Sequence, residues 1–360
     1  MLLVYKKSNL IFVALFSFLI NSCAAPSTAS IVIDKASIEI EEEVQRELLL
    51  KQNLKYQNRL NNIAHNLFIK NKELCQPDVA KVVGIQMYSI SDYSKNYKNA
   101  AKKVYNLDNG LTITSVIKNS PAETAGLKVG DKIISVTDPQ GNKFNVGINE
   151  KTVKLFRKTL KNMKYLDNLT FEINRKGIFS TLTVEPEYAC SYDILLSSSD
   201  ALNASADGMN IYIDKGMMRF VDDDNELALV IAHELAHNAM NHIDKTTSNR
   251  VMGSIVDIAA AAYGVNTQGL FAQQAGLAFS KEFENEADYV ALYYLARAGI
   301  DFQEAGNFWR RMGAEKGVLT VKHATTHPTS PQRFLKIDKA IEEINLKMQN
   351  NEPLVPNYKR

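Results

Sequence analysis

Two histidines four residues apart, His233 and His237, enclose a glutamate in the sequence His-Glu-Leu-Ala-His. On a helix, side chains with this spacing lie on one face, so both imidazoles can reach a single ion. Glu234 follows the first histidine, where its carboxylate can take a proton from an attacking water. Neutral imidazoles and a carboxylate are the usual ligands of catalytic zinc, with a further position left open. The motif therefore indicates a zinc-dependent hydrolase with one Zn²⁺ per chain.

The alternative interpretation is a helix with two structural histidines. The chain has only six histidines in 360 residues, so a chance match to this motif is rare. Val230, Ile231 and Leu235 also predict a buried helix. Polar histidines in such a helix are costly unless they have partners, which favours the metal site.

A third ligand is expected in the acidic segment 280–288, Ser-Lys-Glu-Phe-Glu-Asn-Glu-Ala-Asp. This segment offers Glu282, Glu284 and Glu286, and helical periodicity does not choose among them. Glu284 and Asp288 are four residues apart and share a face, which suits a ligand and a carboxylate that holds a ligand histidine.

The elements that position these residues can be predicted from local patterns. An acidic cluster at 222–225 predicts the N-terminus of a long helix over 226–242. Asp207-Gly208 predicts a hairpin turn within 202–213. The alanine- and glycine-rich stretch 254–278 predicts helices joined near Gly264, and apolar residues within 38–72 predict one or two amphipathic helices.

Residues 82–185 change in character to short strands and turns. The sequence Asn-Ser-Pro-Ala-Glu-Thr-Ala-Gly-Leu at 119–127, followed by Lys-Val-Gly-Asp-Lys-Ile-Ile-Ser-Val at 128–136, resembles a PDZ domain of the bacterial protease-associated type. The resemblance implies a short helix from Pro121, a second helix over 150–163, and capture of peptides or C-termini by strand addition.

The metal motif also has a family resemblance. Together with the segment 280–288 and His-Pro-Thr-Ser-Pro-Gln-Arg at 327–333, it resembles the zinc metallopeptidase family that includes the CAAX prenyl protease, HtpX and BepA. The resemblance implies that three residues bind zinc: His233, His237 and Glu284. It further implies that Glu234 is the general base and that Asp288 supports a ligand.

The same resemblance assigns further roles around the site. His327 is expected to latch the open zinc position or to stabilise the oxyanion, and Arg333 is expected to assist the oxyanion. Asn203 and Ala204 match the edge strand that binds substrate by main-chain hydrogen bonds. His242 is expected to be structural, and Trp309 to lie in the core.

The N-terminus has the pattern of an export signal. Lys6 and Lys7 precede an apolar run at 10–20, and eleven helical residues span only about 16 Å, too short for a membrane-spanning helix. The end of the run resembles a lipobox with Cys23 as the lipidated residue. The alternative is signal cleavage near residues 24–25. We expect a lipoprotein on the periplasmic side of the bacterial outer membrane, or a soluble periplasmic protein if Cys23 is not lipidated.

Cys75 and Cys190 are the other two cysteines. In an exported protein they are expected to face an oxidising compartment, and they bracket the PDZ segment. We therefore predict a disulfide between them; the alternative is two buried free thiols.

The expected fold class is α+β: a mainly helical zincin-type metallopeptidase domain with a small β-hairpin or sheet, interrupted by a PDZ domain formed by a partly open β-barrel with two helices. The expected boundaries are a signal peptide (1–22), a tether (23–39), an N-terminal helical part of the peptidase domain (40–76), the inserted PDZ domain (78–187), the catalytic domain (188–346) and a C-terminal tail (347–360).

The expected function is an exported, lipid-anchored zinc metalloendopeptidase that acts on unfolded or misassembled envelope proteins. With 42 basic and 40 acidic residues, the chain has a net charge of +2, which gives no reason to expect nucleic-acid binding. The expected partners are polypeptide substrates, PDZ ligands and, through the lipid anchor, a membrane. Two alternatives remain: a latched zinc protein that acts mainly as a chaperone or assembly factor, and an adaptor lipoprotein in which the PDZ domain is the active part.

Overall fold

The computed structural model describes residues 28, 30–263, 265–277, 280–315 and 330–358. The chain divides into two units, Met1–Gln45 and Arg46–Arg360. The predictions for the signal peptide and for lipidation of Cys23 lie outside the described residues. Among those residues, no helix combines the length and apolar character needed to cross a bilayer. The first long element is a single helix, α2 (Lys35–Lys70). The sequence did not decide between one helix and two in this region.

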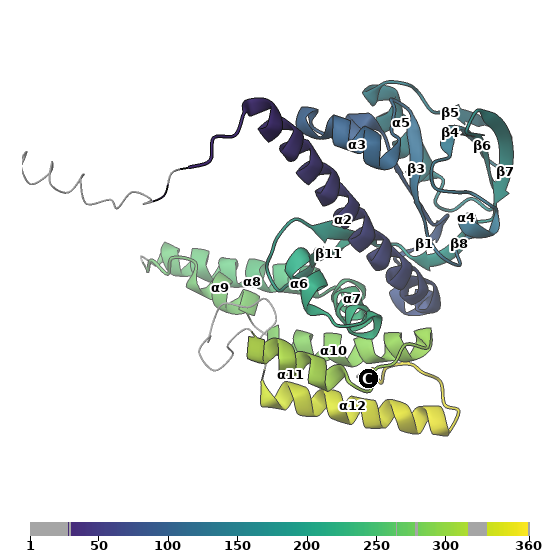
Figure 1. Cartoon of the computed structure of the whole chain (residues 1–360). Coiled ribbons are helices and arrows are strands. Elements are labelled where there is room, and N and C mark those ends of the chain that lie inside the picture. Colours follow the sequence, from purple (N-terminus) through teal and green to yellow (C-terminus); the bar gives the residue numbers. More distant parts are fainter. Residues whose placement is uncertain (1–27, 29, 264, 278–279, 316–329, 359–360) are drawn as a thin grey trace, which may run out of the picture. The chain divides into compact units, whose positions relative to one another are not determined.

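The segment that resembles a PDZ domain forms an antiparallel sheet with strand order β2-β3-β4-β6-β7, and β5 pairs with β4 (Figure 1). Its core contains buried residues from the central strands, including Ile113, Val136 and Phe171. The strands are β2 (Ile85–Tyr88), β3 (Leu111–Val116), β4 (Lys132–Thr137), β5 (Lys143–Asn145), β6 (Leu169–Arg175) and β7 (Ile178–Val184).

Both helices that the sequence predicts in this segment are present. Helix α4 (Pro121–Thr124) begins after Ser120, whose hydroxyl accepts a hydrogen bond from the Glu123 amide. Helix α5 (Glu150–Asn162) begins after Asn149, which forms a capping box with Thr152. A third helix, α3 (Lys98–Tyr105), lies in the connection between β2 and β3 and was not predicted.

The two chain segments that enter and leave this sheet are joined at its base. Strand β1 (Val79–Val82) pairs antiparallel with β8 (Glu187–Cys190), and Val79 lies opposite Cys190. Cys75, in the 3₁₀ turn Lys72–Cys75, forms a disulfide with Cys190, with their Cα atoms 5.6 Å apart. A bridge across 115 residues stabilises by up to about 4–5 kcal/mol in the chain-entropy treatment.

A second, three-stranded sheet follows the disulfide, with strand order β10-β11-β9. Strands β10 (Ala204–Ala206) and β11 (Asn210–Asp214) form the predicted hairpin, and β11 pairs in parallel with β9 (Asp193–Ser197). Asp207 fixes the turn, because its carboxylate accepts hydrogen bonds from the amides of Met209 and Asn210, at 2.9 and 2.6 Å.

Helix α7 (Asp224–Ala239) carries the His-Glu-Leu-Ala-His motif. Its N-cap is Asp223, whose carboxylate accepts a 2.9 Å hydrogen bond from the Glu226 amide. The sequence predicted a helix that continues to about residue 242, and this is wrong at the C-terminal end. The backbone of Asn241 is left-handed, with φ of 55°, so the chain turns and a separate helix starts at His242.

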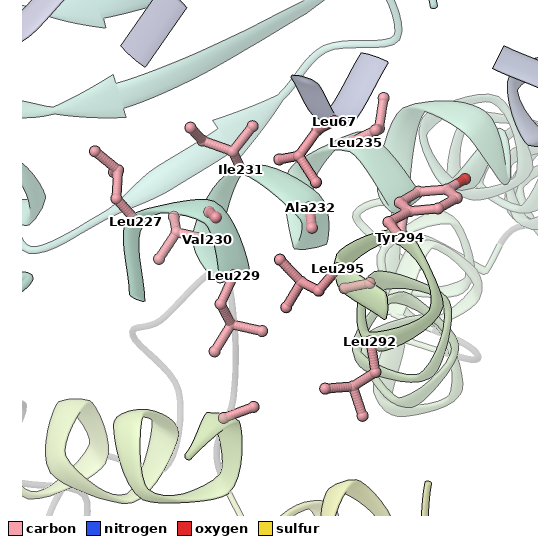
Figure 2. Packing of buried hydrophobic residues seen from close by; sticks show 14 of the residues in the cluster. Leu67, Leu227, Leu229, Val230, Ile231, Ala232, Leu235, Leu292, Tyr294 and Leu295 are labelled. Carbon is pink, nitrogen blue, oxygen red and sulfur yellow. The ribbon is translucent and has the colours of Figure 1, made fainter. Parts of the chain in front are cut away.

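Most of the remaining helices contribute buried residues to one apolar core with α7, whereas the helices over 242–262 and 270–277 contribute none of their described residues and pack against each other. Figure 1 shows α10 between α7 and α12, and Figure 2 shows Leu235 of α7 near Leu67 of α2, with Leu292 and Leu295 on α10. The remaining helices are α6 (Lys215–Phe220), α8 (His242–Ala262), α9 (Leu270–Leu277), α10 (Ser280–Ala298), α11 (Ala305–Glu315) and α12 (Pro331–Gln349).

Candidate metal centre

Helix α7 brings both motif histidines and Glu234 into the interior. His233, Glu234 and His237 have exposed fractions of 0, 2 and 8%. The helical spacing sets the Nε2 atoms of the two histidines 3.1 Å apart, so both face one point. The buried apolar residues on either side hold the helix, and therefore these rings, in place.

Helix α10 supplies a carboxylate at the same point. The Glu284 oxygens lie 3.5 Å from the Nε2 atom of His233 and 3.3 Å from that of His237. Tetrahedral zinc with bonds of about 2.0–2.1 Å places its ligand atoms about 3.3–3.4 Å from one another. The observed spacing of 3.1–3.5 Å therefore fits zinc. Of the other two glutamates, Glu282 is exposed and Glu286 contacts a different residue.

Asp288 contacts the second ring nitrogen of His233, and Arg333 in turn binds Asp288. Asp288 Oδ1 lies 2.9 Å from His233 Nδ1, on the side of the ring away from Glu284. The Arg333 guanidinium donates to both Asp288 oxygens, at 2.5 and 2.8 Å, and its Nη1 lies 3.3 Å from Glu284. Burial opposes ionisation of Asp288, but the charge of Arg333 outweighs it and holds the pKa of Asp288 below its ordinary value.

The two histidines have opposite protonation preferences. Burial lowers the pKa of His237, which keeps its ring neutral, as a ligand must be. Burial also opposes protonation of His233, but contacts with Asp288 and Glu284 outweigh it and raise the pKa of His233 to about 10. The two carboxylates thus favour a positive charge at this point, and a divalent cation would supply it in place of the proton.

Two residues near the site, His242 and Trp309, were not assigned to it from the sequence, and Glu286 was considered there only as a possible metal ligand. His242 Nδ1 lies 3.0 Å from His237 Nδ1, and His242 Nε2 lies 2.8 Å from Glu286 Oε2. The ring of Trp309 is buried in the core, as expected, and also lies 5.1 Å from the His233 ring. No local pattern identified these contacts, because each joins two different helices.

The hairpin proposed to bind substrate is anchored to the motif helix. Asn238, the residue after His237, accepts a 2.8 Å hydrogen bond from the Gly208 amide and donates to the Asn210 carbonyl at 3.2 Å. Ala204 pairs with Ile213, and β10 is at one end of the strand order of the described sheet.

The remaining predicted site residues are His327, Asn203 and Arg333. His327 lies outside the described residues. The Asn203 carbonyl accepts a 3.1 Å hydrogen bond from the Asp214 amide, just before β10 begins. Arg333 is 2% exposed, so it is a buried member of the site.

Two family descriptions match the chain. Residues 182–341 match peptidase family M48, and residues 82–185 match the PDZ domain. The chain therefore contains an M48 metallopeptidase domain and a PDZ domain, in agreement with the resemblances seen in its motifs.

Several known proteins are similar to part of the chain. The mitochondrial metalloendopeptidase OMA1 of Schizosaccharomyces pombe is 32% identical over 151 residues, which are 40% of this chain and 45% of the relative. The beta-barrel assembly-enhancing protease of Yersinia pestis is 28% identical over 161 residues, which are 40% of this chain and 33% of the relative. The protein of that name from Escherichia coli is 26% identical over 137 residues, or 34% and 28% of the two chains. The chain thus spans less than half the length of each of these relatives.

Proposed function

We propose that the chain is an exported, lipid-anchored zinc metalloendopeptidase that cleaves unfolded or misassembled envelope proteins. One observation carries the proposal: the donor atoms of His233, His237 and Glu284 lie within 4.8 Å of one another, and Glu234 is next to the first ligand on the same helix. This arrangement lies within the M48 match, and the named relatives are a metalloendopeptidase and proteases.

Each residue of the site has a role in this proposal. His233, His237 and Glu284 hold the zinc, which when bound polarises the scissile carbonyl and lowers the pKa of a water molecule. Glu234 takes a proton from the attacking water and passes it to the leaving amine. Arg333 holds the carboxylates of Asp288 and Glu284, as its contacts with both support.

Stabilisation of the developing oxyanion is assigned to His327, on the basis of the family resemblance, rather than to Arg333. The Arg333 guanidinium already has Asp288 and Glu284 as partners, so turning it toward a substrate would cost the contacts with two buried carboxylates.

Binding of substrate by strand addition would favour unfolded chains. In this proposal, an extended segment pairs with the backbone at Asn203 and Ala204, where β10 begins. Main-chain pairing needs an extended peptide and reads few side chains, so folded proteins are poor substrates. The PDZ domain would capture C-termini or extended segments and raise their effective concentration near the zinc.

The cellular location is argued from chemistry and similarity. The Cys75–Cys190 disulfide supports an oxidising compartment, as the export signal predicts. Two of the similar proteins are called beta-barrel assembly-enhancing proteases. Both points support a location on the periplasmic side of the outer membrane, with Cys23 as the anchor.

The test is a cleavage time course on an unfolded model protein, with full-length chain purified in detergent and supplied with zinc. Glu234→Gln should lower the rate by about 10²–10⁴-fold, since it removes the general base but keeps the shape. The zinc content of both proteins is measured in parallel and should be equal. Equal cleavage by the two proteins would refute the assignment of Glu234.

The near-complete burial of the metal-site side chains, 0–8% exposed, favours a second candidate: a latched protein that acts mainly as a chaperone or assembly factor. In that case Glu234→Gln would retain biological function, and His327→Ala would gain proteolysis. If His327→Ala and the wild-type chain cleave at the same rate, the latch is refuted.

A further inference from the structure

His242 is a buried histidine that has no part in the proposed reaction. It is the first residue of α8, only 2% exposed, and lies five residues beyond the ligand His237. Its Nδ1 atom lies 3.0 Å from Nδ1 of His237, and its Nε2 atom lies 2.8 Å from the Glu286 carboxylate. These contacts form a chain of three residues: His237, His242 and Glu286.

The direction of each hydrogen bond follows from the ligand role of His237. Its Nε2 atom faces His233 and Glu284, so the lone pair on Nε2 is the one available to a metal. A neutral ring then carries its proton on Nδ1 and donates it to His242 Nδ1. His242 must accept at Nδ1, which leaves its own proton on Nε2, opposite the Glu286 carboxylate. Each donor in the chain therefore has an acceptor.

Three structural features hold His242 in this position. The left-handed backbone of Asn241 turns the chain after α7, so that the start of α8 lies against His237. The ring of Phe283 stacks on His242, with ring centres 4.7 Å apart and planes 20° apart. Glu286 follows Phe283 by three residues on α10, so the helix that supplies Glu284 also supplies both contacts to His242.

We infer that His242 and Glu286 are positioning residues for the metal centre: they fix the tautomer and ring orientation of His237. His233 contacts a carboxylate directly, at Asp288, whereas His237 reaches its carboxylate through a second imidazole. Ligand histidines generally donate their second ring N–H to such a partner, and loss of the partner weakens metal affinity about 10–100-fold. The inference depends on the proposed zinc site but not on peptide hydrolysis.

Two substitutions at His242 separate positioning from packing. His242→Phe keeps an aromatic ring against Phe283 but removes both nitrogens. His242→Asn loses the ring but places Oδ1 where Nδ1 was, so it retains an acceptor for the His237 N–H. If His242 acts by positioning, His242→Asn should keep more of the zinc affinity than His242→Phe. If it acts by packing, His242→Phe should keep more.

The experiment measures zinc affinity of the full-length chain by competition with a chromophoric chelator. His242→Phe and Glu286→Ala should raise the Kd for zinc about 10–100-fold, and His242→Asn should restore it to within a few-fold of wild type. His65→Phe is the matched control, because His65 is a buried histidine of α2 whose charged neighbour is Glu187. It should leave the Kd unchanged.

Folding of every variant is checked by circular dichroism. If His242→Phe does not fold, Glu286→Ala still tests the inference, because the Glu286 side chain is 42% exposed. The inference would be overturned if both His242→Phe and Glu286→Ala bind zinc with wild-type affinity. It would also be overturned if His242→Phe and His242→Asn lose zinc affinity to the same extent. A wild-type chain that binds no zinc would overturn the proposed function as well. Tight zinc binding without cleavage would overturn only the proposed hydrolysis, since the affinities would still test His242.

Discussion

The buried ion pair between Arg333 and Asp288 gives the sharpest prediction about stability. The two side chains are 2 and 3% exposed, and two charge-assisted hydrogen bonds of 2.5 and 2.8 Å join them. Arg333→Met keeps much of the volume of the side chain but leaves the Asp288 carboxylate buried without its cation. We expect the free energy of unfolding to fall by about 3–5 kcal/mol, the usual cost of breaking a buried pair.

The lower end of this range is expected, because His233 contacts the same carboxylate and offsets part of the loss. Two hydrogen bonds to charged groups, each contributing about 1.5–3 kcal/mol, give a total of similar size. A double-mutant cycle with Asp288→Asn should show a coupling of at least about 1 kcal/mol, because the two residues share one interaction.

The assay is urea unfolding in the presence of a chelator, so that zinc binding does not contribute. Trp309 is the only tryptophan of the chain, and it lies 4.8 Å from the Arg333 guanidinium. Its fluorescence therefore reports the unfolding of the apolar core that contains α7.

Arg310→Met is the matched control: Arg310 pairs with Asp338 at 2.5 Å, but both side chains are about 40% exposed. The control should lose less than about 1 kcal/mol. If Arg333→Met loses no more than Arg310→Met, or if the cycle shows no coupling, the reasoning is refuted.

Two further predictions concern the hairpin and the disulfide. Burial opposes ionisation of Asp207, but hydrogen bonds from Asn210 and the turn amides outweigh it and lower the pKa of Asp207 to about 2. Its contribution to stability is therefore present above pH 4 and lost as the pH falls toward 2; an NMR titration midpoint near 4 would contradict this. Cys75→Ser, which also leaves Cys190 unpaired, should lower the free energy of unfolding by up to about 4–5 kcal/mol. Unfolding under non-reducing conditions measures it, and an unchanged midpoint would refute a stabilising role for the bond.

The sequence predicted best those features that depend on a few neighbouring residues. The i, i+4 spacing of His233 and His237 is enough to place both rings on one face, whatever packs around them. The hairpin needed only the turn at Asp207-Gly208, and α7 needed only its acidic N-terminus. The PDZ segment and the M48 segment were identified because their motifs are long and specific.

Features that depend on packing between helices could not be predicted in the same way. Periodicity left Glu282, Glu284 and Glu286 equivalent, and only family resemblance favoured Glu284, because the rotation of α10 relative to α7 is a tertiary property. His242 shows the same limit. On an unbroken helix, five residues turn the side chain about 140° away from His237, and only the left-handed residue Asn241 brings it back.

The joined base of the PDZ segment also determines how force passes along the chain. A pull that reaches residue 75 from one side and residue 190 from the other is transmitted through the S–S bond and the β1–β8 ladder. The sheet between them bears none of this tension, so its six strands can open to a peptide, or be cut within a loop, while the chain before residue 75 and the chain after residue 190 remain covalently linked. The PDZ segment therefore carries no force that is applied to the rest of the chain, although it lies in the middle of the sequence.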